Sequence, residues 1–243
     1  MAERRDAGRR LDRRDFLRLG LVAGPAALLA ACEWDGGPLE SKLARVSRIN
    51  DWVGEHLFLS KDRLAPTYPA WARRGMQMPA YFVSDEVPVL ERPDEWALAV
   101  GGLVRKPMRL TLAELQKLPI TSYTVKHHCV EGWTAIATWT GVPVRAILDL
   151  AEPTAEARYL RFDSFDSDYS NGWDLASAAH PQTILAYAHN DRPLQPDHGA
   201  PLRLYSPLKL GYKLTKYLTA MTLTRARPGG FWEDRGYPWF GGV

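Results

Sequence analysis

The sequence predicts a mixed α+β fold, with mixed sheets and short helices that come one after another without a regular alternating unit. The first observation is a series of short runs rich in β-branched and aromatic residues, bounded by glycine or proline, which is typical of strands. The second is that the helical patterns between these runs are short and unevenly spaced. The roughly 212 residues after position 31 are enough for one substantial core and too few for two domains, so we expect a single core.

The chain begins with a pattern typical of export signals. Arg13-Arg14-Asp15-Phe16-Leu17-Arg18 matches a twin-arginine pattern, and the apolar stretch of about 13 residues after it is too short to span a bilayer. Leu29-Ala30-Ala31-Cys32 resembles a lipobox, in which Cys32 carries the lipid. We predict that residues 1–31 are a twin-arginine lipoprotein signal and that the protein is exported, periplasmic or otherwise extracytoplasmic, and lipid-anchored at Cys32. An ordinary signal peptide with a chance cysteine is the alternative.

The positive balance of the chain belongs to this signal. The formal net charge is +3, and residues 1–31 hold seven Arg and four acidic residues, so the rest of the chain is close to neutral. That part contains no run of Lys and Arg interleaved with aromatic residues. We therefore expect no nucleic-acid partner.

The elements are predicted in order along the chain. Apolar residues over 43–58 have loose helical spacing, and prolines interrupt the next segment, so residues 32–78 are predicted to be a tether and an N-terminal lobe. Trp96 to Val100 alternates large and small residues like a strand, which Gly101-Gly102 ends. Thr111 and Glu114 have the spacing of a helix capping box, and Pro119 stops that helix.

The second half of the chain continues in the same way. Proline at a helix start predicts a short helix after Pro143, and helical spacing predicts another over residues 175–188. Strands are predicted over residues 121–125, 158–162, 202–205 and 213–224 from their β-branched and aromatic content. Cys129 therefore comes shortly after the end of a strand.

Cys129 is the residue with the clearest chemical meaning. It lies in Lys126-His127-His128-Cys129-Val130-Glu131-Gly132-Trp133, and once Cys32 is lipidated no intramolecular disulfide can form. A buried cysteine acting as a small apolar residue is one interpretation. A catalytic nucleophile is a second, but it needs a nearby base, and the adjacent His128 is poorly placed to point at it.

Two further interpretations involve a soft metal. A blue-copper site would combine Cys129 with His127, but no further His or Met comes closely after them. Alternatively, Cys129 is the single protein ligand of a redox metal whose other ligands come from an organic cofactor. Glycine-rich nucleotide loops and the His-Glu-x-x-His helix are both missing from the sequence.

Several motifs in one order support the last interpretation through a family resemblance. Cys129 to Trp133 resembles the molybdenum-ligand motif of the sulfite-oxidase-fold molybdopterin enzymes, and most closely that of the periplasmic methionine-sulfoxide reductase catalytic subunits. Further similar segments are Trp96 to Val104, Trp139 to Pro143, His198 to Leu204, Lys213 to Tyr217 and Gly230 to Tyr237. The resemblance covers residues 80–240, so 79–243 is predicted to be a molybdopterin-binding oxidoreductase domain.

This resemblance implies roles for particular residues. Cys129 is expected to bind molybdenum, with molybdopterin supplying further ligands. The residues expected to contact the pterin and its phosphate are Ser164, His198, Arg203, Leu214, Thr215 and Lys216. Arg and Lys suit a phosphate because they form charge-assisted hydrogen bonds. Glu131 and Tyr237 are expected as proton donors on the substrate side.

The expected activity is two-electron oxygen-atom transfer on a small-molecule substrate, with sulfoxide reduction as one form. The expected electron partner is a membrane haem or quinone-linked subunit. Sulfite-type oxidation is the alternative enzyme, and a copper electron-transfer or binding lipoprotein is the alternative from another class. The pattern of the sulfite oxidases has basic residues beside the ligand cysteine, whereas here Val130-Glu131-Gly132 follows Cys129. That pattern also has Arg and His shortly after an aromatic pair, whereas here Ser84-Asp85-Glu86 follows Tyr81-Phe82-Val83.

Overall fold

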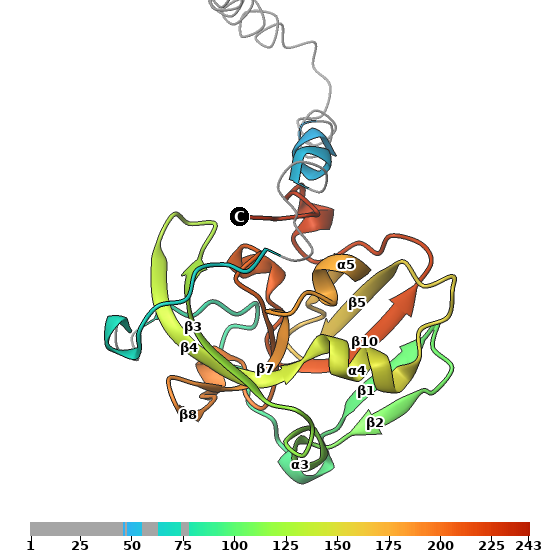
Figure 1. Cartoon of the computed structure of the whole chain (residues 1–243), viewed down its shortest axis with the longest axis horizontal. Coiled ribbons are helices and arrows are strands. Elements are labelled where there is room, and N and C mark those ends of the chain that lie inside the picture. Colours follow the sequence, from blue (N-terminus) through green and yellow to red (C-terminus); the bar gives the residue numbers. More distant parts are fainter. Residues whose placement is uncertain (1–45, 47, 55–62, 74–77) are drawn as a thin grey trace, which may run out of the picture. The chain divides into compact units, whose positions relative to one another are not determined.

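The computed structural model describes residues 46, 48–54, 63–73 and 78–243 (Figure 1). Leu43–Val243 forms one compact unit. The predicted signal and the lipid site at Cys32 lie outside the described residues, and the predicted domain boundaries stay a prediction. The mixed α+β class is confirmed, because strands and short helices alternate irregularly along the chain.

The first sheet has the strand order β2-β1-β10-β5-β6. β1 (Leu98–Gly102) runs parallel to β10 (Leu218–Thr224) and antiparallel to β2 (Met108–Leu110). On its other side, β10 is antiparallel to β5 (Tyr159–Ser164), which pairs with β6 (Ser170–Asp174). The central strands thus come from both ends of the domain, so the sheet closes only when the last strand is added.

The second sheet has the order β3-β4-β7-β8, and β9 also pairs with β7. β3 (Thr121–His128) and β4 (Thr134–Pro143) form a long antiparallel hairpin, drawn in light green in Figure 1. β4 then pairs with β7 (Ile184–His189), which pairs with β8 (Arg192–Pro193) and β9 (Arg203–Tyr205). The hairpin end with Cys129 projects beyond the rest of this sheet.

The helices are short and connect strands. The α-helices are α3 (Leu112–Leu115), α4 (Val144–Ala151) and α5 (Leu175–Ala178). The 3₁₀ turns are η2 (Ala70–Ala72), η3 (Pro93–Glu95), η4 (Pro196–His198), η5 (Gly211–Lys213) and η6 (Glu233–Arg235). Two of them, η4 and η5, lead directly into segments that line the cavity beside Cys129.

Four sequence predictions are confirmed in detail. Thr111 and Glu114 form a reciprocal capping box at the start of α3. Pro143 directly precedes α4, and Cys129 comes immediately after β3. The described part of the predicted helix over 43–58 is helical at residues 48–53.

The prediction of a helix over 175–188 is wrong beyond its first turn. α5 ends at Ala178, and Pro181, which cannot continue a helix, comes soon after. β7 begins at Ile184, and its first residues are fully buried. A continuous buried run carries no alternation of polar and apolar residues, so periodicity cannot distinguish a strand from a helix here.

Two strand boundaries differ from the prediction, and one long strand was not predicted. Gly101 and Gly102 were predicted to end the first strand, but both belong to β1. Gly102 has φ +77°, and a Cβ there would lie 2.2 Å from the carbonyl oxygen of Leu223 in the neighbouring strand β10. The predicted strand over 213–224 begins only at Leu218, because η5 and a left-handed Tyr217 precede it. β4 has clear strand character but was not predicted.

One buried apolar cluster joins the two sheets. It includes Leu98 of β1 and Phe162 of β5 from the first sheet, and Trp139 of β4 and Leu185 of β7 from the second. Complete burial of each such side chain contributes about 1.5–3 kcal/mol. The core therefore fixes the two sheets against each other, and the one cysteine among the described residues, Cys129, is free.

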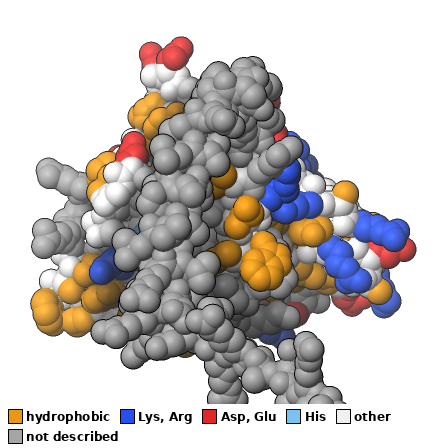
Figure 2. All heavy atoms as spheres, turned by 90° about the horizontal axis from the view of Figure 1, so that it is seen from above, with side chains coloured by type: hydrophobic (Ala, Val, Ile, Leu, Met, Phe, Trp, Pro, Cys, Tyr) orange, Lys and Arg blue, Asp and Glu red, His pale blue; other side chains and the backbone are white. Residues whose placement is uncertain are grey.

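The molecular surface is mixed in charge. On the face shown in Figure 2, the visible Lys and Arg side chains lie among apolar and a few acidic side chains. None of the helices in the described residues has the length and apolar character needed to cross a membrane.

The close backbone approach between β4 and β7 generates a stability prediction. A Cβ on Gly141 would lie 2.0 Å from the carbonyl oxygen of Leu185, whereas a Cβ on Gly101 would meet nothing within 4 Å. We expect Gly141→Ala to lower the free energy of unfolding by about 3 kcal/mol or more, because backbone must move. Gly101→Ala is the matched control and should be close to neutral. Chemical denaturation of both variants measures the difference, and equal stabilities would contradict the assigned strand contact.

Candidate active site

The end of the β3–β4 hairpin fixes the position of Cys129. The Cys129 N–H donates to the carbonyl oxygen of Trp133 at 3.0 Å, and the Gly132 N–H donates to the carbonyl oxygen of Cys129 at 3.1 Å. Gly132 has φ +89°, a conformation that favours glycine. The thiol is thus held on a short hydrogen-bonded turn and not on a long loop.

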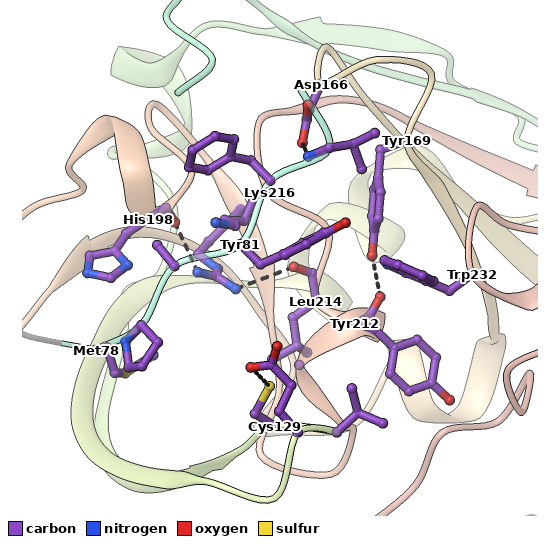
Figure 3. Close-up of a pocket in the computed structure, with 18 of the residues that line it drawn as sticks. Met78, Tyr81, Cys129, Asp166, Tyr169, His198, Tyr212, Leu214, Lys216 and Trp232 are labelled. Atoms are coloured by element: carbon purple, nitrogen blue, oxygen red, sulfur yellow. Dashed lines mark hydrogen bonds between the residues drawn. The ribbon is translucent and has the colours of Figure 1, made fainter. Parts of the chain in front are cut away.

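The thiol faces a cavity of about 360 Å³, which is in the size range of small-molecule sites. The walls come from six separate parts of the chain: 78–83, 127–133, 164–169, 198–203, 211–217 and 232–237. Figure 3 shows Cys129 at the base of this space, with Lys216 and His198 toward one side and Trp232 toward the other.

The cavity brings together all but one of the residues predicted from the sequence. Cys129, Glu131, Ser164, His198, Arg203, Leu214, Lys216 and Tyr237 line it. Thr215 does not: its side chain is fully buried, and its carbonyl oxygen accepts from the Leu204 N–H. Thr215 therefore contributes to the site through the backbone that holds Leu214 and Lys216.

A carboxylate lies beside the thiol. The Cys129 Sγ is 3.6 Å from Glu131 Oε2, and the indole N–H of Trp133 donates to the same oxygen at 2.8 Å. Burial, together with the nearby Glu131 charge, raises the pKa of the Cys129 thiol above its usual value. In the isolated chain the thiol therefore keeps its proton, and a bound metal ion is the kind of positive charge that releases it.

Two cations lie at another part of the cavity. Arg203 is buried and donates to the carbonyl oxygens of His198 at 3.0 Å and Leu214 at 3.3 Å, with its guanidinium 4.9 Å from the Trp139 ring centroid. Lys216 Nζ donates to the carbonyl oxygen of Asp197 at 2.8 Å. Burial lowers the pKa of Arg203 to about 10, and burial and the Arg203 charge lower the pKa of Lys216 to about 7.

Buried hydrogen-bond donors in this region still lack partners. The Nε of Arg203 and the hydroxyl of Tyr217 have no hydrogen-bond partner among the described residues. Such buried groups are rare in folded proteins. A ligand with acceptor oxygens and negative charge, such as a phosphate, satisfies both donors and pairs with the two cations.

Asp166 fixes the wall opposite the hairpin. Its carboxylate accepts hydrogen bonds from the N–H groups of Val83 and Ser84 at 2.7 and 2.8 Å, and from the Ser84 hydroxyl at 2.6 Å. The Asp166 N–H donates to the hydroxyl of Ser164 at 3.0 Å. Asp166 therefore ties the irregular segment 78–84 to the end of β5, where Ser164 lies.

An aromatic wall completes the cavity. Trp232 lies 4.9 Å from Tyr237 and 5.8 Å from Tyr81, measured between ring centroids. Tyr169 donates its hydroxyl to the carbonyl oxygen of Tyr212. Apart from Tyr237, neither these aromatic residues nor Asp166 were predicted to be site residues. Trp232 lies within the segment Gly230 to Tyr237 of the family resemblance, which was the one signal for it.

The donor set fits a pterin-held metal better than a copper centre. In the described parts of the chain, no group of three or more His, Cys, Asp and Glu residues is spaced to hold a metal ion. A blue-copper site needs such a set. A single thiol with a cationic pocket in the same cavity instead suits a metal that arrives with an anionic organic cofactor.

Comparisons with known proteins agree with this geometry. The profile of the family described as "Oxidoreductase molybdopterin binding domain" matches residues 84–232. A protein of Azospira oryzae with the provisional name protein-methionine-sulfoxide reductase subunit YedZ1 is 40% identical over 243 residues, covering 98% of this chain and 92% of that protein. The protein-methionine-sulfoxide reductase catalytic subunit MsrP of Campylobacter jejuni is 28% identical over 244 residues, covering 91% and 76% respectively.

A solved structure shows the same fold. The sulfane dehydrogenase SoxCD from Paracoccus pantotrophus matches with a TM-score of 0.57 at 22% sequence identity, covering 71% of this chain and 50% of that chain. The lone thiol, the cationic pocket and these matches lead to one assignment. The chain belongs to the oxidoreductase molybdopterin-binding domain family, and it is a molybdenum–molybdopterin oxidoreductase with a sulfite-oxidase-type fold.

Proposed function

We propose that this enzyme reduces sulfoxides, with methionine sulfoxide as the substrate type. The two relatives named above are called protein-methionine-sulfoxide reductase subunits, which supports this choice. Reduction of a sulfoxide to a sulfide and water consumes two electrons and two protons. When bound, the molybdenum cofactor supplies the two-electron exchange that accompanies oxygen-atom transfer.

The observation that carries the proposal is the Glu131 carboxylate 3.6 Å from the Cys129 thiol. A carboxylate beside the reacting position repels an anionic substrate such as sulfite. Two like unit charges about 4 Å apart repel each other by about 4 kcal/mol at an effective dielectric constant of about 20. A sulfoxide is neutral, so it avoids this repulsion.

The aromatic wall supports the same substrate type. Tyr81, Trp232 and Tyr237 line the cavity and lie against one another. Aromatic faces and edges make favourable contacts with the sulfur and methyl groups of methionine-like side chains. The wall therefore suits a substrate with an apolar sulfur substituent.

The roles proposed for the chain's own residues come from their positions. Cys129 is the proposed molybdenum ligand, and Ser164, His198, Arg203, Leu214, Thr215 and Lys216 are the proposed pterin contacts, Thr215 through its backbone. Glu131 and Tyr237 line the same cavity as Cys129. We propose that they deliver the protons that the departing oxygen requires, Glu131 after its carboxylate has taken up a proton from water.

Electrons, location and anchoring complete the proposal. Because the relatives are named as subunits of a reductase, an electron-donating partner is expected, and we propose a membrane haem or quinone-linked subunit. Export by the twin-arginine route and a lipid on Cys32 would keep the enzyme beside such a partner. The sequence pattern over residues 13–32 supports this location.

Loss of the thiol tests the ligand assignment. We expect Cys129→Ser to lower kcat by at least about 100-fold, because the metal loses its protein sulfur ligand. Molybdenum K-edge absorption should report one fewer sulfur neighbour, and metal analysis should report the molybdenum content per chain. Cys32→Ser is the control and should keep both. An unchanged sulfur count in Cys129→Ser would rule out the assignment.

Substrate charge tests the proposed reaction. The purified holoenzyme should reduce methionine sulfoxide with an artificial electron donor and should not oxidise sulfite at a comparable rate. We expect Glu131→Gln to lower kcat for the sulfoxide by about 100-fold, because a proton donor is lost, without loss of molybdenum. Glu91→Gln, on the exposed surface, is the matched control. Faster sulfite oxidation than sulfoxide reduction by the wild type would overturn the proposal.

The export proposal is tested by charge-conserving changes. Arg13→Lys with Arg14→Lys should leave the protein in the cytoplasm, because the twin-arginine pattern is lost. Arg9→Lys with Arg10→Lys is the matched control pair and should export normally. Cys32→Ala should be exported but released from the membrane fraction. Cell fractionation with immunoblotting measures all three, and equal fractionation of the two arginine variants would contradict the proposed signal.

A further inference from the structure

A buried ion pair lies outside the set of residues assigned above. Lys213 is fully buried, and its ammonium group donates to the carboxylate of Glu233 and, at 2.8 Å, to the carbonyl oxygen of Gly172. The Glu233 side chain is itself only 4% exposed. Breaking a buried pair is costly because it leaves an uncompensated charge. The pair is therefore a strong structural link between its two segments.

The two segments belong to different sides of the site. Lys213 ends η5 and directly precedes Leu214 and Lys216, the proposed pterin contacts. Glu233 begins η6 in the C-terminal strap, which we define as residues 225–242. Trp232 and Tyr237, on either side of η6, form the aromatic wall of the cavity.

The strap has little regular structure of its own to hold this wall. Apart from the short turn η6, it contains no helix or strand in the described residues. Its link to η5 has a second point: the hydroxyl of Tyr212 donates to the carbonyl oxygen of Pro238 at 2.6 Å. The two neighbouring residues Tyr212 and Lys213 thus hold the strap on both sides of Tyr237.

The local sequence makes room for the pair. A Cβ on Gly230 would lie 2.4 Å from Glu233 Oε2, so this position needs glycine for the carboxylate to turn inward. The Gly236 φ of +91° ends η6 and returns the chain to Tyr237, whose N–H donates to the carbonyl oxygen of Trp232 at 3.1 Å. These contacts set the position of both aromatic rings relative to Glu233.

We propose that Lys213 and Glu233 are positioning residues that fix the Trp232–Tyr237 wall to the pterin-binding segment and thereby set the affinity for substrate. The pair acts through the wall and does not touch the reacting atoms. Its effect on sulfoxide reduction rests on the function proposed above. Its effect on the strap does not.

The test uses a charge-free pair of similar volume. In Lys213→Met with Glu233→Met, neither buried charge is left alone, which protects folding. Lys106 and Glu152 form an exposed ion pair of the same residue types, so Lys106→Met with Glu152→Met is the matched control. Trp232→Ala removes part of the wall directly and shows the effect expected when the wall is lost.

With the purified holoenzymes, we expect the Lys213/Glu233 double variant to raise KM for methionine sulfoxide about tenfold or more, and we expect the same of Trp232→Ala. Its kcat and its molybdenum content should stay within about twofold of wild type. A merely structural role would lower kcat and the molybdenum content together. A KM equal to wild type, or a parallel loss of kcat and molybdenum, would overturn the proposal.

Hydrogen–deuterium exchange gives a readout that needs no substrate. Peptides covering residues 229–238 should exchange about tenfold faster in the double variant, while those of the β3–β4 hairpin should not change. If wild-type enzyme fails to reduce sulfoxides, the proposed function fails but this measurement still decides the positioning role. Unchanged exchange over 229–238 would refute it.

Discussion

The site depends on the short hydrogen-bonded turn at the end of the β3–β4 hairpin. Pairing of Cys129 with Trp133 across this turn fixes the thiol to the end of a hairpin whose second strand pairs with β7 and is buried in the common core. Strand ends place side chains more reproducibly than long loops do. Among the described residues Cys129 is the one cysteine, so the position of this proposed metal ligand is set by the hairpin. The other segments that line the cavity surround this fixed thiol.

The second constraint is the cost of burying cations. Arg203 is buried against Trp139 and two carbonyl oxygens, and its Nε lacks a partner among the described residues. Burial lowers the pKa of Lys216 to about 7, so this lysine is only partly charged at neutral pH. A phosphate bound at the proposed site would favour the charged form of both side chains and accept hydrogen bonds from them. Binding of the cofactor there would then stabilise the fold, as any ligand of the native state does.

The sequence was informative wherever a local rule determines the structure. The capping box at Thr111, the helix after Pro143 and the strand end before Cys129 depend on neighbouring residues, and all three are confirmed. The interval 175–188 was predicted wrongly beyond α5 because the first residues of β7 form a continuous buried run, which has no periodic signal. Most of the aromatic wall was missed because Tyr81, Tyr169 and Trp232 meet only in the folded chain. The motif order could place Thr215 in the pterin segment, but only the structure shows that its side chain turns inward.

The distribution of charge within the one cavity explains how a common fold can serve different substrates. Arg203 and Lys216 line the part of the cavity proposed for the anionic cofactor, whereas the charge of Lys213, which does not line the cavity, is paired with the buried carboxylate of Glu233. The thiol, by contrast, has a carboxylate for its neighbour and aromatic rings across the cavity. The cationic side chains of the cavity thus lie in the part proposed for the cofactor. The three residues directly after Cys129 carry no positive charge. A neutral sulfoxide needs no such charge, while a sulfite anion would have to approach Glu131 without compensation.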